Sequence, residues 1–383
     1  MCGIAGKVTA GAPVERDLLE RMCDALAHRG PDSAGLHLDG AVGLGMRRLA
    51  VIDPAGGEQP IYSEDGQVVL VLNGEIYNHR ALRDELAARG HRLAGGSDAE
   101  VVVHLYEEMG ARCVERLRGM FAFAVWDARR RRLLLARDRL GKKPLHWAVW
   151  DGAVLFGSEP RALLQDSALP CEPDPAALDA FLVNQYVPHH LSAFRHMRKL
   201  PPASTLVWEP GGRPRVRRYW EPAGGPSLVL GAREAEESLR ERLLDATRVR
   251  LEADVPLGAF LSGGIDSSAV VAAMARSGAA TLRTFSVRFP DQGFDESAYA
   301  RAVARHYGTE HRELEVGPVD PGLLARMAWH LGEPLADPAA VPTFQLSELT
   351  RAHVTVALSG DGGDESFGGY RRYRQLALTR VPG

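Results

Sequence analysis

Cys2 is the residue whose type and position most clearly suggest chemistry, because it directly follows the initiator methionine. A small second residue normally allows that methionine to be removed, so that Cys2 would carry a thiol and a free α-amine together. The α-amine has an ordinary pKa of about 7.7–8.0, so part of it is neutral near pH 7 and can accept the thiol proton. We therefore predict that Cys2 is an activated nucleophile of the N-terminal type.

A second chemical feature is the string LSGGIDSS at residues 261–268, which lies between a short apolar segment and an Ala-rich segment. A Gly-rich turn at the start of a helix presents several backbone N–H groups to an anion, and Ser262, Ser267 and Ser268 add hydroxyl donors. The string lacks the Gly-Lys-Ser/Thr of the P-loop that grips β- and γ-phosphates. The pattern therefore predicts a phosphate-binding turn of another kind.

The first 160 residues must supply the elements that hold Cys2. The apolar run 68–72 predicts a buried strand, and segments 121–126 and 133–136 predict a hairpin. A helix is predicted over 78–90, with an Asn N-cap and a Gly stop, and another from Ser97 through Glu107 by a capping-box pattern. Many strands with few helices indicate packed antiparallel sheets with helices outside.

The second half of the chain has a different texture, in which strands alternate with helices around the phosphate-binding turn. This alternation is typical of a parallel α/β sheet. Residues 208–231 are rich in Pro, Gly and Arg and are the best linker candidate between the two halves. The predicted helices cover 232–252, 269–277 and 298–308, and the predicted strands cover 255–261, 284–289 and 354–358.

Composition excludes several classes of protein. The 383 residues include 46 Lys plus Arg and 49 Asp plus Glu, for a net charge of −3, which is a poor fit to nucleic-acid binding. No apolar stretch approaches roughly 18 residues, and the N-terminus lacks the pattern of a secretory signal. We therefore expect a cytoplasmic protein with reduced thiols and with no nucleic-acid or membrane partner.

Five motifs of the N-terminal half occur together: CGIAG at 2–6, HRGPDS at 28–33, RRLAVID at 47–53, LNGEIYN at 72–78 and GSDAE at 96–100. Together they resemble the class II glutamine amidotransferase domain, an N-terminal nucleophile hydrolase with an αββα sandwich. The resemblance covers residues 1 to about 190. HRGPDS is interpreted as structural, because the α-amine already fills the role of the base.

The resemblance implies how glutamine would bind beside Cys2. Arg48 would pair with the substrate α-carboxylate, and Asp98 would accept from its α-ammonium. The side-chain amide of Asn73 and the backbone N–H of Gly74 would stabilise the oxyanion. The implied glutamine-binding residues are Arg48, Leu49, Ala50, Val51, Ile52, Asn73, Gly74, Glu75 and Asp98.

LSGGIDSS resembles the loop of the ATP pyrophosphatases, which form an adenylate and release pyrophosphate. A second matching string, ALSGDGGDESFGGYRRY, covers 357–373, and its Asp361 would lie near the acyl-adenylate. Asp266 and Asp364 would hold Mg²⁺ on the phosphates of ATP. Segment 333–344 would border the substrate pocket. The implied ATP-binding residues are Leu261, Ser262, Gly263, Gly264, Asp266, Ser267, Ser268, Val287, Ser359 and Gly360.

The whole arrangement resembles the glutamine-hydrolysing asparagine synthetases. It implies an α+β glutaminase sandwich at 2–190, a linker region at 191–231 and an α/β parallel-sheet ATP-pyrophosphatase domain at 232–383. The implied reaction converts aspartate, glutamine, ATP and water to asparagine, glutamate, AMP and diphosphate, with ammonia passing through an internal tunnel to β-aspartyl-AMP. A homodimer is compatible with this resemblance.

Two alternatives remain open, and a third is disfavoured. Amidation of another carboxylate fits the same motifs, whereas amidotransferases with sugar-phosphate domains are disfavoured because those domains lack SGGxDSS. The region from 232 to 383 is shorter than the family's synthetase domain, and the family's helical C-terminal part, with its lysine, lies beyond it. A fragment or a naturally short chain would then have an incomplete second domain. We would expect such a chain to hydrolyse glutamine but to make asparagine poorly, or to act as a regulatory module.

Overall fold

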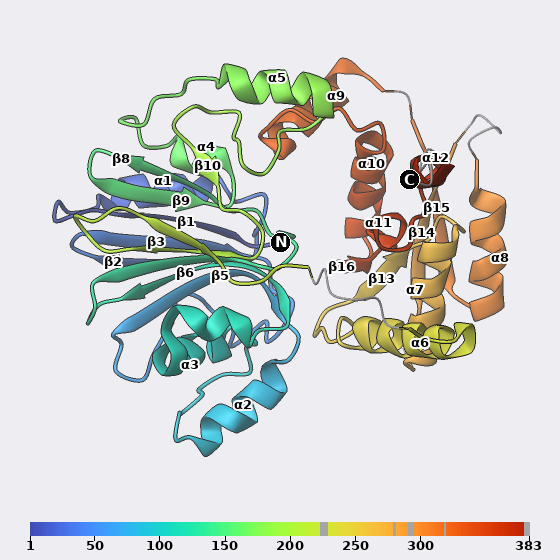
Figure 1. Ribbon diagram of the computed structural model, residues 1–383, viewed down its shortest axis with the longest axis horizontal. Helices are drawn as coiled ribbons and strands as arrows, with labels where there is room; N and C mark the ends of the chain where they lie inside the picture. Colours follow the sequence, from blue (N-terminus) through green and yellow to red (C-terminus); the bar gives the residue numbers. More distant parts are fainter. Residues whose placement is uncertain (223–228, 279–280, 290–294, 318, 379–383) are drawn as a thin grey trace. The chain divides into compact units, whose positions relative to one another are not determined.

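The computed structural model describes residues 1–222, 229–278, 281–289, 295–317 and 319–378, and it divides the chain into two compact units (Figure 1). Unit 1 comprises Met1–Gly225 and Leu324–Asp337, and unit 2 comprises Pro226–Leu323 and Pro338–Gly383. Each unit is described by itself.

Unit 1 contains two antiparallel sheets, each of six strands among the described residues. The first has the order β10-β8-β9-β1-β3-β2 and the second the order β12-β11-β7-β6-β5-β4. The strands of the first are β1 (Gly3–Val8), β2 (Ser33–Asp39), β3 (Val42–Arg48), β8 (His146–Trp150), β9 (Ala153–Gly157) and β10 (Arg198–Lys199). Those of the second are β4 (Ile61–Tyr62), β5 (Val68–Ile76), β6 (Gly119–Asp127), β7 (Arg132–Arg137), β11 (Ser204–Trp208) and β12 (Arg215–Arg218).

The two sheets face each other, and helices cover their outer faces (Figure 1). One core cluster lies between the sheets and joins Ile4 and Leu44 of the first to Val69 and Val71 of the second. Alternate residues of β5, including Leu70, pack under the helices instead, so both faces of this strand are buried. This explains its continuous apolar run and confirms the αββα sandwich. Helices α1 (Arg16–Asp24) and α4 (Pro160–Leu163) cover the first sheet, and α2 (His79–Ala88) and α3 (Glu100–Met109) cover the second.

The predicted hairpin is formed by β6 and β7, whose pairing ends at Asp127 and Arg132. The two predicted helix caps are wrong in detail. Asn78 is the N-cap residue of α2 as predicted, but its side chain does not cap the helix, because it accepts from the Arg118 N–H and donates to the Arg116 carbonyl oxygen. Helix α3 begins only at Glu100, whose carboxylate accepts from the preceding loop and not from a cap residue.

The expected linker region at 191–231 requires a correction, because it contains β10, β11 and β12 of the sandwich. Strand β11 pairs with β7, and its Leu206 is fully buried. The Arg-rich composition that indicated a linker belongs to β12, an exposed edge strand where charged side chains discourage further pairing. Gly211, with φ of 84°, supplies the turn between β11 and β12.

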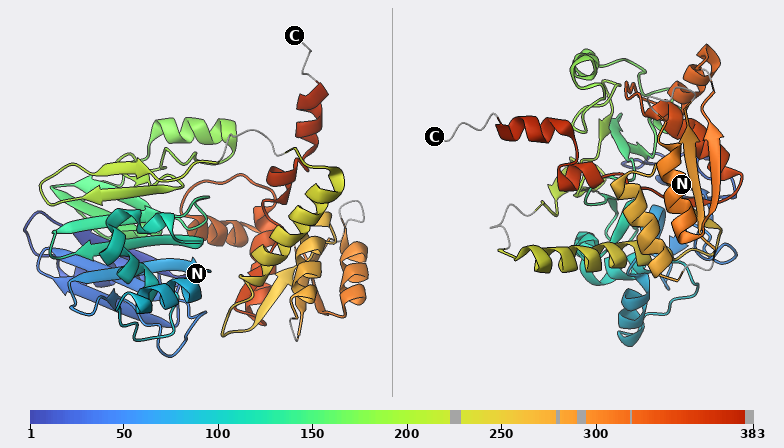
Figure 2. Two further views of the ribbon diagram at one scale, coloured as in Figure 1. Left: turned by 60° about the horizontal axis from the view of Figure 1, so that its bottom comes forward. Right: turned by 90° about the vertical axis from the view of Figure 1, so that its right-hand side faces the viewer.

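Unit 2 is built on a four-stranded parallel sheet with the order β15-β14-β13-β16, which confirms the α/β prediction. The order reverses between β13 and β16, and loops at such a switch point form the usual ligand site of α/β sheets. Helices lie on both sides of the sheet (Figure 2). The strands are β13 (Leu257–Phe260), β14 (Arg283–Arg288), β15 (Glu310–Glu315) and β16 (Val356–Leu358). The helices are α6 (Ala232–Arg248), α7 (Ile265–Arg276), α8 (Ser297–Tyr307), α10 (Ala340–Arg351), α11 (Gly363–Phe367) and α12 (Arg371–Leu378).

The expectation of one continuous domain at 232–383 requires a correction. Residues 324–337 pack in unit 1, although they follow the first strands of unit 2. Trp329, on α9 (Pro321–Leu331), lies under the Arg161 guanidinium at 3.9 Å. Glu333 accepts from the Ala193 N–H at 2.8 Å and forms an ion pair with Lys199. These contacts are long-range in sequence, which is why composition alone does not predict them.

Two further elements of unit 1 complete the description: the 3₁₀ helix η1 (Gly110–Glu115) and helix α5 (Pro175–Asn184). None of the helices formed by described residues combines the length and the apolar character needed to cross a bilayer.

Candidate active sites

Cys2 lies immediately before β1, and its surroundings hold the thiol in place. Its Sγ accepts from the Leu49 N–H at 3.4 Å, and its carbonyl oxygen accepts from Arg29 Nε at 3.0 Å. Burial raises the pKa of the Cys2 thiol, although the Leu49 N–H and the positive charges of the chain terminus and Lys143 act in the opposite direction. A thiol with a raised pKa needs a base at hand before it can act as a nucleophile.

Arg48 is buried at the end of β3, and its guanidinium holds the loop that follows. It donates to the carbonyl oxygens of Ile52 at 3.0 Å, Asp53 at 2.7 Å and Pro54 at 3.0 Å. These bonds fix the loop that carries Leu49 to Ile52, the predicted glutamine-binding stretch. The direct pairing of Arg48 with a substrate carboxylate stays a prediction.

Residues of the HRGPDS segment form hydrogen bonds to Cys2 and to the loop that carries Leu49 to Ile52. Arg29 bonds to both Cys2 and Glu159, the latter at 2.8 Å. Asp32 accepts from the Ala50 N–H at 2.9 Å. Gly30 lies so close to the Arg47 backbone that any Cβ there would collide with it. These contacts support the structural interpretation of the segment, and Arg29 is a positioning residue that the sequence reasoning did not single out.

Asn73 and Gly74 lie next to each other on β5. The Asn73 side chain is fully buried, and neither its amide nitrogen nor its amide oxygen has a hydrogen-bond partner among the described residues. A Cβ at Gly74 would collide with the Met120 carbonyl oxygen of the neighbouring strand. Buried polar groups are nearly always paired, so an unpaired amide on a rigid strand indicates a group kept for a ligand.

Glu75 and Asp98 form a pair of carboxylates, of which Asp98 is buried and Glu75 is half-buried. Asp98 Oδ2 accepts from the Ile76 N–H at 2.6 Å. Burial raises the pKa of Asp98, and burial together with the Asp98 charge raises the pKa of Glu75 to about 8. The structure thus brings Glu75 and Asp98 into electrostatic contact, and Glu75 also feels the charge of Arg48.

Lys143 is the main member of this site that the sequence reasoning missed. Burial lowers its pKa to about 8, against the charge of Glu75 and of the Cys2 thiol. The only signal in the sequence was the string RDRLGKKPL at 137–145, which contains two adjacent lysines. The structure shows that Lys143 is the buried one.

The loop after β13 has the geometry of a phosphate-binding turn. The Ser262 and Ser267 hydroxyls lie 3.0 Å apart, and Ser262 Oγ accepts from the Gly264 N–H at the start of α7. Gly263 has a φ of 85° and lies against the backbone of α8, where a side chain would not fit. The Ser268 hydroxyl is buried without a partner among the described residues. The loop, the N-terminus of α7 and the unpaired Ser268 hydroxyl are together suited to binding an anion.

The loop after β16 packs directly on this turn. Cβ atoms built at Gly360 and Gly363 would collide with Ser267 and with the Asp266 carboxylate respectively, so both loops approach through glycine. Ser359 donates to Asp361 at 2.9 Å. The structure therefore brings the two predicted ATP loops together. Val287 lies near the carboxyl end of β14, and Leu261, which follows β13, is held by its N–H bond to the Phe285 carbonyl oxygen.

Asp266 and Asp364 are the predicted Mg²⁺ ligands. Asp266 lies in the first turn of α7 and Asp364 in the first turn of α11, so each carboxylate follows one of the two loops. Hard oxygen ligands on two converging loops are suited to Mg²⁺ bound together with phosphates. The donor set therefore fits the ion, although its binding here stays a prediction.

The two candidate sites lie in an αββα sandwich and beside a parallel α/β sheet, the architecture of a glutamine amidotransferase domain followed by an asparagine synthase domain. Family models agree: residues 1–220 match the glutamine amidotransferase domain and residues 238–382 match asparagine synthase. The chain belongs to the glutamine-hydrolysing asparagine synthetase family.

Individual relatives carry two kinds of name. Asparagine synthetase [glutamine-hydrolyzing] 1 of Bacillus subtilis is 38% identical over 100% of this chain and 61% of its own length. A putative asparagine synthetase of Methanocaldococcus jannaschii is 34% identical over 100% of this chain and 79% of its own length. Amidase chyE of Penicillium rubens is 34% identical over 99% of this chain and 60% of its own length. The chain thus spans only about three fifths of two of these relatives.

Proposed function

We propose that this chain hydrolyses glutamine at Cys2 and uses the ammonia, with ATP, to convert aspartate to asparagine. The observation that carries the proposal is the unpaired, buried amide of Asn73 on β5. It supplies an oxyanion donor that has no other described partner, in the motif that also contains Gly74. Membership of the family supports ATP as the second substrate.

The glutaminase half-reaction needs only groups of unit 1. Once Met1 is removed, the Cys2 α-amine takes the thiol proton, and the sulfur attacks the carboxamide carbon of glutamine. Asn73 and Gly74 donate to the resulting oxyanion. Its collapse breaks the C–N bond, and ammonia leaves with the proton from the amine. Water then hydrolyses the thioester to give glutamate and the free thiol. Asp98 and Glu75 would receive the substrate ammonium.

The synthetase half-reaction would take place at the loops of unit 2. A carboxylate oxygen of aspartate attacks the α-phosphorus of ATP, and diphosphate leaves as the acyl-adenylate forms. Ammonia then attacks the acyl carbon, and AMP departs. The Ser268 hydroxyl, which has no partner among the described residues, and the N-terminus of α7 would hold the departing phosphates. Mg²⁺, held by Asp266 and Asp364, would neutralise phosphate charge when bound.

Amidation of a different carboxylate is a second candidate, because some relatives with this domain arrangement are named amidases. The two candidates share both sites and differ only in the acceptor. We also propose glutamine, aspartate and ATP as the small-molecule partners, whereas a homodimer and a cytoplasmic location stay predictions.

Cys2→Ala tests the glutaminase proposal. Glutamate release from glutamine should be lost, because no other residue supplies the thioester, while any activity with free ammonia should survive. Cys171→Ala is the matched control, because Cys171 is a free and exposed cysteine. Glutamate, diphosphate and asparagine should be measured separately, with aspartate replaced by other carboxylic acids in parallel. Undiminished glutamate release by Cys2→Ala would disprove the proposal.

A further inference from the structure

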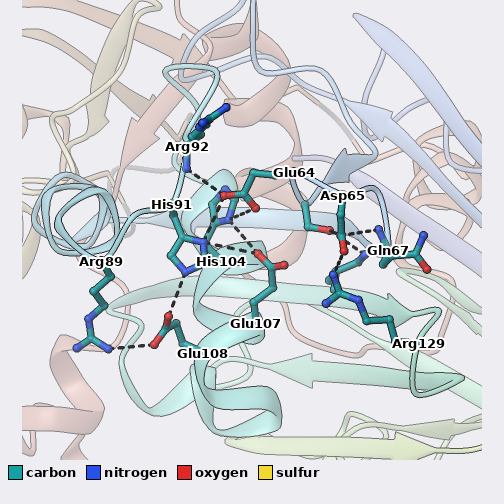
Figure 3. Close-up of polar contacts among 12 residues, drawn as sticks. Glu64, Asp65, Gln67, Arg89, His91, Arg92, His104, Glu107, Glu108 and Arg129 are labelled. Atoms are coloured by element: carbon teal, nitrogen blue, oxygen red, sulfur yellow. Dashed lines mark hydrogen bonds and ion pairs between the residues drawn. The ribbon is translucent and has the colours of Figure 1, made fainter.

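A compact group of imidazoles and carboxylates lies outside both candidate sites (Figure 3). Glu64 lies in the turn between β4 and β5, His91 follows α2, and His104 and Glu107 lie three residues apart on one face of α3. One ligand atom from each of these four residues lies within 4.8 Å of all the others. Three segments distant in sequence thus direct metal-binding atoms at one point.

Four distances between ligand atoms of this group lie between 3.1 and 3.8 Å, and Glu64 takes part in two of them through different oxygens. His91 Nδ1 lies 3.4 Å from Glu64 Oε1, and His104 Nδ1 lies 3.4 Å from Glu64 Oε2. Glu107 Oε2 lies 3.1 Å from His104 Nδ1 and 3.8 Å from His91 Nδ1. Tetrahedral Zn²⁺ with bonds of about 2.0–2.2 Å has ligand–ligand distances of about 3.3–3.6 Å. The contact between His104 and Glu107 has the length of a hydrogen bond, whereas the other three contacts are longer than the usual range of about 2.7–3.2 Å.

Glu108 fixes the orientation of the His91 ring from outside the group. Its carboxylate lies 3.2 Å from His91 Nε2 and is itself held by Arg89 at 3.1 Å (Figure 3). In a neutral ring with its proton on Nε2, the lone pair on Nδ1 faces the carboxylates of Glu64 and Glu107, which is the side on which a shared metal ion would lie. A carboxylate behind a histidine ligand is also the usual outer shell of a zinc site.

Burial shelters most of this group from water. The His104 side chain is 1% exposed. The side chains of His91 and Glu107 are 14% and 16% exposed, and Glu64, at 36%, is the side open to solvent. The site therefore has shielded ligands and one route by which an ion can enter.

We propose that Glu64, His91, His104 and Glu107 form a structural zinc site. Two imidazole nitrogens and two carboxylate oxygens suit Zn²⁺, whereas Mg²⁺ and Ca²⁺ favour shells made only of oxygen. Four protein ligands close the tetrahedron and leave no position for a substrate. The ion would cross-link the β4–β5 turn, the loop after α2 and helix α3.

The test uses the full 383-residue chain, stripped of metal with a chelator and titrated with Zn²⁺ against a chromophoric zinc indicator. One Zn²⁺ should bind per chain, and Mg²⁺ should not compete. His91→Ala and Glu64→Gln should each weaken binding by more than about 100-fold, since changes in the outer shell alone cost about 10–100-fold. Glu108→Ala should fall in that smaller range. His196→Ala, at a half-buried histidine beside Glu172, should bind as the unchanged chain does.

Two further readouts separate this site from binding at Cys2 or other thiols. X-ray absorption at the zinc edge should show only nitrogen and oxygen ligands, and Zn²⁺ should raise the melting temperature of the unchanged chain but not of His91→Ala. Circular dichroism of the metal-free variants should match that of the metal-free parent. Absence of stoichiometric zinc, sulfur in the ligand shell, or equal affinity of His91→Ala and His196→Ala would each overturn the assignment.

Discussion

Replacing the buried amide of Asn73 should change the stability of the protein and its glutaminase activity in opposite directions. It has no described partner, and an unpaired buried polar group costs about 1–3 kcal/mol. In Asn73→Leu that cost disappears, so the melting temperature should rise or hold. The same change removes one oxyanion donor, and kcat for glutamine hydrolysis should fall about 10²–10³-fold.

Asn78→Leu is the matched control for this experiment. Its side chain is paired with Arg116 and Arg118, so the change should lower the free energy of unfolding and leave kcat nearly unchanged. If the Asn73 amide were structural only, Asn73→Leu would behave like Asn78→Leu. Steady-state glutamate release and thermal unfolding of both variants distinguish the two cases.

The carboxylates of Glu75 and Asp98 should release a proton when glutamine binds. Burial and the Asp98 charge raise the pKa of Glu75 to about 8, so the pair retains a proton near pH 7. A substrate ammonium beside the pair favours the charged carboxylates and lowers their pKa. Calorimetry with the Cys2→Ala chain, in two buffers of different ionisation enthalpy at pH 7, should therefore report release of up to about one proton.

Glu75→Gln supplies the control, because it removes one of the two carboxylates whose pKa is raised and leaves Asp98 without a neighbouring carboxylate. Proton release should then nearly vanish, even if glutamine still binds. A binding enthalpy that does not depend on the buffer in the Glu75-containing chain would contradict this account of the pair.

Single residues were predictable from the sequence where the chemistry depends on position in a motif. Cys2, Asn73 and Asp98 could be singled out because resemblance gives each of them a role. Lys143 and the protonation of Glu75 could not, because both depend on burial created by strands that are distant in sequence. The hydrogen-bond partners of Arg48 could not be predicted either, since nothing in RRLAVID shows that its guanidinium donates to carbonyl oxygens of the loop that follows it.

At the scale of elements, the contact between the two ATP loops depends on glycine. A Cβ at Gly360 would lie 2.7 Å from the Ser267 backbone nitrogen. Gly360→Ala should therefore push the loop after β16 away from α7, at a cost of about 1–3 kcal/mol. If the whole of this cost is paid when ATP binds, the affinity for ATP should fall about 5- to 150-fold. Glutaminase kcat should be unchanged, because its residues lie in unit 1.

Asp266→Asn at the same pair of loops should weaken binding of ATP with Mg²⁺ far more than binding of glutamine. Gly231→Ala is the matched control for Gly360→Ala, since a Cβ there meets open space. Calorimetric titration with ATP measures all three variants. Unchanged affinity in a folded Gly360→Ala chain would show that nucleotide does not use the packed loops.

Elements were predictable where one strong local pattern decides them. The run 68–72 is apolar throughout because both faces of β5 are buried, and the β6–β7 hairpin follows from two apolar runs around a polar turn. The position of the Asn78 cap was predicted, but its capping bond and the capping box at Glu100 were not formed, because both side chains bond to residues outside their helices. Strand β12 resembled a linker because an exposed edge strand and a linker have the same composition.

At the scale of the whole molecule, the chain crosses between its two units more than once. Residues 324–337 return to unit 1, while the residues on either side of them belong to unit 2. The sequence predicted two domains of different class, but not this return, because it depends on single contacts such as the one between Ala336 N–H and the Gln185 carbonyl oxygen.

Glu333 should be the residue on which this return most depends. It is 13% exposed, and it accepts from the Ser192 hydroxyl at 3.1 Å and the Ala193 N–H at 2.8 Å while it pairs with Lys199. Glu333→Ala removes all three partners at once. The free energy of unfolding should fall by about 1.5–3 kcal/mol, the range for hydrogen bonds to a charged group, and hydrogen exchange at Ala193 should speed up.

Glu172→Ala provides the comparison, because its ion pair with Arg195 is about half exposed and should contribute less than about 1 kcal/mol. Glu333→Gln should lie between the two, since an amide oxygen can still accept from Ala193 but cannot pair with Lys199. Denaturant unfolding and peptide-level hydrogen exchange over 185–195 and 332–337 rank the three variants. If Glu333→Ala cost no more than Glu172→Ala and left exchange in both peptides unchanged, other contacts would hold the segment, with Trp329 against Arg161 next to be tested.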